Sequence, residues 1–375
     1  MRKICFLLLL VIIVAFSFTS CLKKTTEPDN DLPLAPSPVI SPAGGTFTTP
    51  QSVSISCDLS GSEIRYTIDG SDPNSTSLLY TRPIMIKTTQ LIKAIALHEG
   101  YKQSVVDSAS FTMNFIIPEN MVFIQGGTFC PNSGSYIVTL TSFLIGKYEL
   151  TQSEWKSVMT GNTNGIPVTP YGNPGYPGLG DDFPMYYVSW YDALVYCNRR
   201  SIQEGLTPCY AKDGDTNPDH WGFVPTQTNI YWDAITMNIN ADGYRLPTEM
   251  EWEFAARGGN QSQNYIYSGS FNIWEVAWFT YNSNNTTHKI GTKIPNEQGL
   301  YDMSGNVWEW CWDWYDPYPI GSYINPTGPG GGNLRIGRGG GWSAQAQYCQ
   351  ISNRPISYPF CRDNSIGFRV VRRIQ

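Results

Sequence analysis

Between about residues 35 and 113, hydrophobic and polar residues alternate in short runs. One run is Val53-Ser54-Ile55-Ser56, and Ile64-Arg65-Tyr66-Thr67-Ile68 repeats the same period. Alternation places every second side chain on one face of a strand, and turn residues recur roughly every ten positions. The pattern predicts an all-β sandwich over residues 35–113.

Beyond residue 121, three segments carry hydrophobic residues at helical spacing, each after a residue that can cap a helix. They run from about Thr151 to Met159, from Trp190 to Glu204 after Ser189, and onward from Thr248. Thr151 and Thr248 are each followed three positions later by a glutamate, which is the spacing of a capping box. Glycine and proline recur too often elsewhere for long elements, so we expect a loop-rich α+β domain.

The N-terminus has the pattern of an export signal. Two basic residues precede the apolar stretch Ile4 to Phe16, small residues follow it, and Phe18-Thr19-Ser20-Cys21 resembles a bacterial lipobox with phenylalanine in place of leucine. We predict that residues 1–20 are a signal peptide, that Cys21 carries lipid, and that residues 21–34 tether the protein to a membrane of the bacterial envelope, the outer membrane in our interpretation. Simple secretion and an uncleaved anchor are the alternatives.

Composition excludes one class of partner. Charged residues make up 15% of the chain, aromatic residues 14%, and the formal net charge is -6 with no basic patch, so we expect no binding to nucleic acid. Setting aside Cys5 and Cys21 leaves seven cysteines. An odd number cannot all pair, so we expect at least one free thiol.

Three motifs in residues 121–375 resemble the formylglycine-generating enzyme (sulfatase-modifying factor) family. They are GYRLPTEMEWE at 243–253, GLYDMSGNVWEW at 299–310, and RGGGW at 338–342 with GFR at 367–369. The resemblance implies a C-type-lectin-like, loop-rich fold for this domain, with residues 114–120 as the linker before it.

Residues 64–73 and 92–96 resemble the immunoglobulin-like module at the C-terminus of chitobiases. This resemblance implies a spacer that carries the next domain. Glycan binding by Tyr66 or Tyr80 is the alternative.

Catalytic members of the formylglycine-generating family carry two cysteines, five positions apart, that bind copper and activate oxygen to oxidise a sulfatase cysteine. Here the second is Cys349, but Ala344 stands where the first is expected. Cu(I) prefers two soft thiolate ligands. We therefore expect the oxidase activity, and with it the copper cofactor, to be lost. The alternative is a working formylglycine-generating oxidoreductase that uses Cys349 differently or with Cys361 as a distant partner.

A second part of the resemblance concerns calcium. Asp302, Gly305, Val307 and Glu309 match a calcium site of the family, and carboxylates with backbone carbonyls supply the oxygen ligands that Ca²⁺ prefers. The resemblance implies a structural calcium ion that orders the loop. In the alternative, Glu309 is the buried partner of an arginine.

The segment from Trp342 to Ser365 is rich in tyrosine, serine, asparagine and glutamine, which is the chemistry of adaptable binding surfaces. Its position resembles the variable region of proteins diversified by retroelements. We predict a ligand-binding or display module for a protein or glycan ligand, with a polar loop without partner and a structural envelope component as alternatives. The predicted ligand-binding residues are Trp308, Trp342, Ser343, Gln345, Gln347, Tyr348, Gln350, Asn353 and Tyr358.

Overall fold

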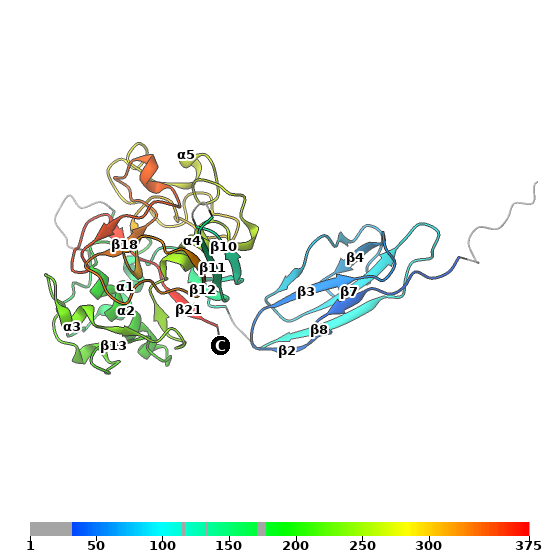
Figure 1. Cartoon of the computed structure of the whole chain (residues 1–375), viewed down its shortest axis with the longest axis horizontal. Coiled ribbons are helices and arrows are strands. Elements are labelled where there is room, and N and C mark those ends of the chain that lie inside the picture. Colours follow the sequence, from blue (N-terminus) through cyan, green and yellow to red (C-terminus); the bar gives the residue numbers. More distant parts are fainter. Residues whose placement is uncertain (1–31, 115–116, 132–133, 171–177, 375) are drawn as a thin grey trace, which may run out of the picture. The chain divides into compact units, whose positions relative to one another are not determined.

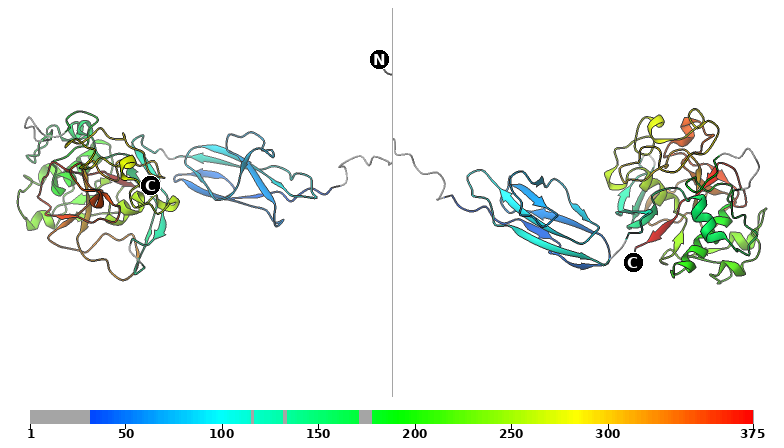
Figure 2. Two further views of the ribbon diagram at one scale, coloured as in Figure 1. Left: turned by 90° about the horizontal axis from the view of Figure 1, so that it is seen from above. Right: turned by 180° about the vertical axis from the view of Figure 1, so that it is seen from behind.

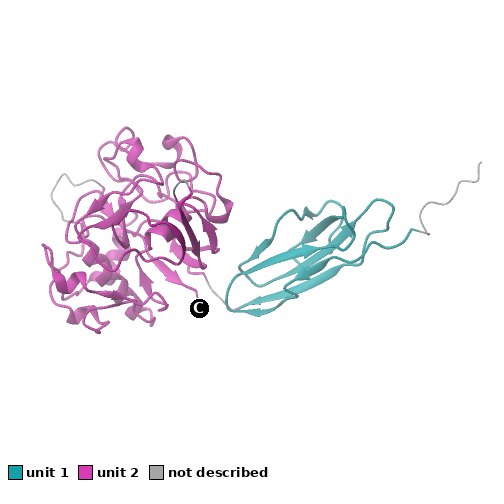
Figure 3. Cartoon of the chain, viewed as in Figure 1, with its two compact units in different colours: residues 1–113 teal, residues 114–375 magenta. Residues whose placement is uncertain are grey.

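The computed structural model describes residues 32–114, 117–131, 134–170 and 178–374. It divides into two compact units, residues 1–113 and 114–375, which Figure 3 colours separately. The predicted signal peptide, Cys21 and nearly all of the predicted tether lie outside the described residues. Within the described ranges, no helix has the length and apolarity needed to cross a membrane.

The first unit is a β-sandwich, as its alternating pattern predicts (Figure 1). One sheet has the order β1-β3-β6 and the other β2-β8-β7-β4-β5. The strands are β1 (Val39–Ser41), β2 (Gly45–Phe47), β3 (Gln51–Ser56), β4 (Glu63–Thr67), β5 (Leu78–Leu79), β6 (Ile84–Ile86), β7 (Gln90–Leu97) and β8 (Asp107–Met113).

Alternation along these strands builds the core between the two sheets. Val53 and Ile55 of β3 are buried, while the serines between and after them are exposed. Phe111 of β8 joins the same core, and Tyr66 and Tyr80 pack against its edge with their rings 6.4 Å apart. Both tyrosines therefore contribute packing to the sandwich.

The second unit contains four small sheets and short helices, which confirms the predicted α+β class (Figures 1 and 2). The sheet orders are β15-β21-β12-β9, β19-β18-β16-β20, β10-β11-β17 and β13-β14. The strands are β9 (Met121–Ile124), β10 (Gly127–Phe129), β11 (Tyr136–Leu140), β12 (Phe143–Gly146), β13 (Tyr210–Ala211), β14 (Thr236–Met237), β15 (Tyr244–Arg245), β16 (Trp308–Trp314), β17 (Gly321–Ile324), β18 (Arg335–Arg338), β19 (Ile356–Ser357), β20 (Ile366–Gly367) and β21 (Val371–Arg373).

The three predicted helices are present, and each begins after its predicted cap. Thr151, Ser189 and Thr248 each accept a hydrogen bond from the backbone three residues on, in complete capping boxes. The α-helices are α1 (Gln152–Met159), α2 (Trp190–Gln203), α3 (Ile230–Asp233), α4 (Glu249–Ala256) and α5 (Ile273–Val276), and the 3₁₀ helices are η1 (Pro218–His220), η2 (Gly259–Gln261) and η3 (Ala346–Cys349).

The sheet β19-β18-β16-β20 positions the predicted binding segment. Strand β16 pairs antiparallel with β18 and parallel with β20, so that Trp308 lies opposite Ile366. Helix α4 packs against β16 and β18 through the fully buried Trp252. The loop between β18 and β20, which contains the predicted ligand-binding residues from Trp342 onward, therefore starts and ends on a buried frame.

Candidate functional site

Cys349, the one predicted catalytic residue, is completely buried at the end of η3. The glycines before the loop allow the chain to pass over it: Gly340 has φ +86°, and a Cβ there would lie 2.5 Å from the Cys349 sulfur. Burial raises the pKa of the Cys349 thiol to about 12. The reactive thiolate form is therefore strongly disfavoured.

The surroundings of Cys349 do not fit a copper site with two thiolates. Its hydrophobic cluster contains Ala344 and the aromatic rings of Tyr267 and Phe279, whereas Cys361 is half-buried and lies outside that cluster. No disulfide bond joins two described cysteines, and no group of three or more His, Cys, Asp or Glu side chains among the described residues is placed to hold a metal.

The predicted ligand-binding residues fall into two groups. Trp342, Gln350, Asn353 and Trp308 are half-buried, and two of them support the loop: the Trp342 indole N–H donates to the Asn364 carbonyl at 3.1 Å, and the Asn353 amide donates to the Tyr348 carbonyl at 3.1 Å. The second group is exposed. We call it the display surface, and it consists of Ser343, Gln345, Gln347, Tyr348 and Tyr358.

A cavity of about 310 Å³ lies beside this loop, against β16 and β20. Of the predicted residues, only Trp308 lines it. Five other lining residues lie in the predicted segment but were not predicted to bind ligand: Pro355, Ile356, Ser357, Asp363 and Ser365. Trp310, Gly337 and Ile366 join them through strand pairing that the sequence alone does not show.

Exposed aromatic residues around α5 were also missed. Phe271, Trp274 and Tyr281 are more than half exposed, and the segment they belong to is joined to the loop by the hydrogen bond from the Thr280 N–H to the Ala344 carbonyl. The sequence places five large aromatic residues in these eleven positions, but only the structure shows that Phe279 is buried and Trp278 half-buried.

Glu309 is the buried partner of an arginine, as the alternative interpretation expects, and calcium binding at this loop stays a prediction. Arg369 donates two hydrogen bonds to the Glu309 carboxylate, at 2.6 and 2.7 Å, and both residues are fully buried. The Trp252 indole donates to the same carboxylate at 2.7 Å. The guanidinium supplies the positive charge that a calcium ion would have supplied.

The rest of the predicted calcium set lies in a tight buried loop. Asp302 and Gly305 both have positive φ, and the Asp302 carboxylate accepts a hydrogen bond from the Gly291 N–H at 2.7 Å through one oxygen. Its other oxygen is buried and has no partner among the described residues. Val307 donates its N–H to Glu149. The set therefore fits calcium only in part, through Asp302 and backbone carbonyls.

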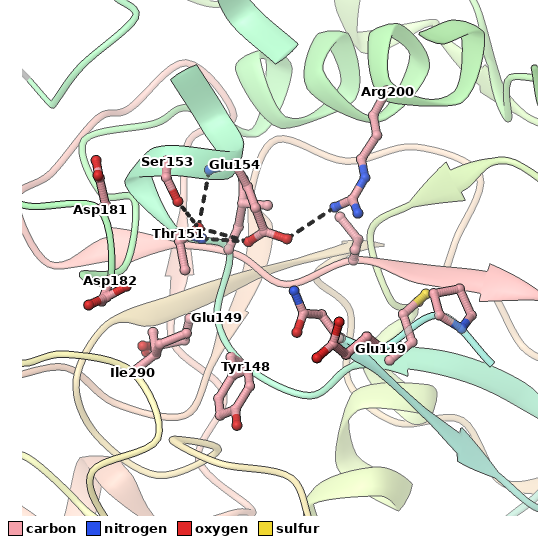
Figure 4. A pocket seen from close by; sticks show the side chains of 16 residues that line it. Glu119, Tyr148, Glu149, Thr151, Ser153, Glu154, Asp181, Asp182, Arg200 and Ile290 are labelled. Atoms are coloured by element: carbon pink, nitrogen blue, oxygen red, sulfur yellow. Dashed lines mark hydrogen bonds and ion pairs between the residues drawn. The ribbon is translucent and has the colours of Figure 1, made fainter. Parts of the chain in front are cut away.

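An acidic cavity of about 350 Å³ lies at the start of α1 (Figure 4). Carboxylates from Glu119, Glu149, Glu154, Asp181 and Asp182 line it, together with the guanidinium of Arg200. Two of these carboxylates hold structure in place: Glu154 completes the α1 capping box, and Glu149 accepts hydrogen bonds from the Asn306 amide and the Val307 N–H. This cavity thus borders the polar scaffold of the buried 302–307 loop.

Three buried carboxyl groups should make the second unit less stable as the pH rises. Burial raises the pKa of Asp302 to about 6 and that of Asp313 to about 8, and it also raises the pKa of Glu149. Because the folded state holds these protons more tightly than the unfolded state, their contribution is complete below about pH 4 and is lost as the pH rises toward each folded pKa. We expect each group to lower the free energy of unfolding by up to about 1.4 kcal/mol per pH unit, which lowers the melting temperature by about 3 °C.

Melting curves between pH 4 and 9 measure this dependence. Asp313→Asn should flatten the curve up to about pH 8, and Asp302→Asn should flatten only the part below about pH 6. Asp316→Asn is the matched control because Asp316 is exposed. A wild-type melting temperature that rises steadily across this range would contradict the prediction.

Comparison with known proteins agrees with both resemblances. Residues 111–374 match the family described as "Sulfatase-modifying factor enzyme 1-like domain", and residues 42–108 match the "Chitobiase/beta-hexosaminidase C-terminal domain". The two matches stand in the order predicted from the sequence. Together they assign a family to each of the two units.

Individual relatives share the larger domain. The chain is 39% identical to the chaperone protein LppX of Paenibacillus barcinonensis, over 71% of this chain and 94% of that protein. It is 34% identical to the formylglycine-generating enzyme of Streptomyces coelicolor over 38% of this chain and half of the enzyme. The solved structure of Treponema denticola variable protein 1 is 34% identical, with a TM-score of 0.59 over 72% of this chain and 96% of that one. The chain therefore belongs to the sulfatase-modifying factor enzyme 1-like family.

Proposed function

We propose that this protein is an exported, lipid-anchored binding module of the bacterial envelope whose family domain holds a protein or glycan ligand on the display surface. One observation carries the proposal. Cys349, the predicted catalytic residue, is buried in a hydrophobic cluster, whereas the side chains of the display surface are exposed, uncharged and capable of hydrogen bonding.

The chemistry of the display surface favours binding. Tyrosine rings offer contact area at low entropic cost, and glutamine and serine offer adaptable donors and acceptors. Tyr348 and Tyr358 are each nearly half exposed, and the Tyr358 ring is stacked on Phe360 at 5.3 Å. The buried frame of β16, β18 and β20 limits the entropy that the loop would lose when a ligand binds.

The relatives support the proposal through their names. The Paenibacillus relative is called a chaperone protein, which favours a protein ligand, and the Treponema structure is of a variable protein, which suits a surface whose residues change. The Streptomyces relative is a formylglycine-generating enzyme and favours oxidation as the second candidate function. The burial of Cys349 and the alanine at position 344 weigh against that candidate.

We expect alanine replacement of Gln345, Gln347, Tyr348 and Tyr358 together to abolish ligand capture without unfolding the domain, because these side chains are exposed. Chain 22–375 would be immobilised and incubated with envelope proteins and envelope glycans of the source bacterium. Retained material is identified by mass spectrometry. The wild type should hold a defined set of molecules that the fourfold variant loses.

A matched control keeps this experiment specific. Alanine replacement of Phe223, Ile230 and Tyr231 removes large side chains elsewhere in the same domain that are more exposed than Tyr348 and Tyr358. The control should retain what the wild type retains. Identical retention by the fourfold variant, or no selective retention by the wild type, would refute the role of the display surface.

The membrane anchor is a separate prediction. Cys21→Ser removes the thiol that would carry lipid, so the full-length protein should move from the membrane fraction to the soluble fraction. Detergent partitioning of cells that express each form measures the change, and Cys57→Ser serves as the control. If the Cys21→Ser protein stays with the membrane, the anchor lies elsewhere.

A further inference from the structure

A third cavity, of about 240 Å³, lies between β11, β17 and the end of β16. It shares no lining residue with the cavity beside the display surface. Tyrosine rings and prolines form half of its wall, namely Tyr136, Tyr318, Tyr323, Pro317, Pro319, Pro326 and Pro329. Its character is thus aromatic, with polar groups confined to a few positions.

The three tyrosine rings form a corner. The Tyr136 ring is stacked on Tyr318 with centroids 5.2 Å apart, and it meets Tyr323 at 5.4 Å with an angle of 63°. Rings at such angles present both faces and edges to one space, and the faces carry negative potential. One of them already holds a cation, because the Arg354 guanidinium lies 3.9 Å from the centroid of Tyr318.

Asp313 supplies an unpaired carboxylate oxygen in the same wall. Its side chain is only 4% exposed, and one oxygen, Oδ2, accepts the Glu249 N–H at 2.7 Å. No donor of a described residue reaches the other oxygen, Oδ1. A Cβ at Gly328 would lie 3.0 Å from Oδ1, so the glycine, which has φ +74°, keeps this side of the carboxylate free of a side chain.

The remaining charges leave this carboxylate without a hydrogen-bonded cation. Arg354 donates two hydrogen bonds to Glu249, at 2.6 and 2.8 Å, and so neutralises that residue. Arg335 lies behind the wall over the indoles of Trp190 and Trp314, and donates to the Trp312 carbonyl. Burial raises the pKa of this carboxyl to about 8, so a proton covers its charge near neutral pH, and a cation that reaches Oδ1 can take the place of that proton.

From this arrangement we propose that the cavity binds a primary alkylammonium group. The ammonium donates a hydrogen bond to Asp313 Oδ1, and its methylene groups lie against the rings of Tyr136 and Tyr323. The ring faces attract the positive charge, and the apolar wall covers the alkyl chain. Such a group can belong to a free diamine or to a lysine side chain.

Titration calorimetry with chain 22–375 at pH 9, where most of the Asp313 carboxyl is ionised and most of a primary amine is still protonated, tests the proposal with three probes. Cadaverine represents a free diamine, Nα-acetyl-lysine-methylamide represents a lysine side chain, and choline has no N–H donor. We expect millimolar or tighter binding of at least one primary amine and weaker binding of choline. The better of the two amines identifies the source of the group.

Variants separate the parts of the site. Asp313→Asn should weaken amine binding by about tenfold or more, because the charge-assisted hydrogen bond is lost. Tyr323→Ala removes a partly exposed ring and should weaken amine binding several-fold. This variant keeps the test valid if Asp313→Asn does not fold. Asp213→Asn, which changes an exposed carboxylate that does not line this cavity, is the control and should change affinity less than twofold. Absence of amine binding, unchanged binding in both variants, or equal affinity for choline would overturn the proposal.

Discussion

Arg369→Ala is expected to destabilise the larger domain by about 3–5 kcal/mol and to lower its melting temperature by roughly 10 °C. Arg369 is fully buried and holds Glu309 through two hydrogen bonds. It also donates to the carbonyls of Gly146 and Tyr301, which joins β12 to the 302–307 loop. Removing the guanidinium leaves the Glu309 carboxylate buried without its counter-charge, near two further buried carboxyl groups.

Two further variants make this test specific. Arg372→Ala removes an arginine of β21 whose side chain is half-buried and bonded only to a backbone carbonyl among described residues, so we expect a loss below about 1 kcal/mol. Combining Arg369→Ala with Glu309→Gln should cost less than the sum of the single changes, because the double variant leaves no unpaired charge.

Two results would contradict the role that we give to the pair of Arg369 and Glu309. A melting temperature of Arg369→Ala within about 2 °C of the wild type would show that the pair is dispensable. Stabilisation of the wild type by calcium that disappears in Asp302→Asn would restore the calcium site predicted from the sequence. We expect instead that calcium and a chelator give the same wild-type melting temperature, because Arg369 already occupies Glu309.

The sequence was informative where the determining contacts are local. Helices α1, α2 and α4 begin where capping residues and their partners lie three positions apart, so a short window contains the whole signal. The alternation of β3 likewise depends only on neighbouring residues. In each case the side chains that determine the element belong to the element itself or to its cap.

The sequence was less informative where the deciding partner is distant. The motif around Glu309 left open which arginine could pair with it, and the partner is Arg369, sixty residues later. The aromatic cavity joins Tyr136 to Asp313 and Gly328 across almost two hundred positions, and no motif marks that meeting. The polar character of the display surface could be read from the sequence. The anchoring role of Trp342 could not, because it depends on the hydrogen bond from its indole to the Asn364 carbonyl.

A further prediction concerns the oxidation of a sulfatase-type peptide by this protein. We expect the copper-supplied wild type not to convert the cysteine of a Cys-x-Pro-x-Arg peptide to the aldehyde. Position 344 offers no sulfur, and the Cys349 thiol is buried with a pKa of about 12. Mass spectrometry of the peptide, after incubation with protein, Cu(I), oxygen and a reductant, measures conversion directly.

Ala344→Cys tests the reason for that expectation. Ala344 and Cys349 belong to the same hydrophobic cluster, so a second sulfur at position 344 would face a thiol in apolar surroundings, and two soft ligands hold Cu(I) far better than one. Affinity for Cu(I) should therefore rise by at least about tenfold in Ala344→Cys, whereas Ser343→Cys, which places the sulfur on the exposed side, should raise it much less. Aldehyde formation by the wild-type protein that is abolished in Cys349→Ser would refute the binding-module proposal, because the buried thiol would then be reaching substrate through an opening that the folded domain does not show.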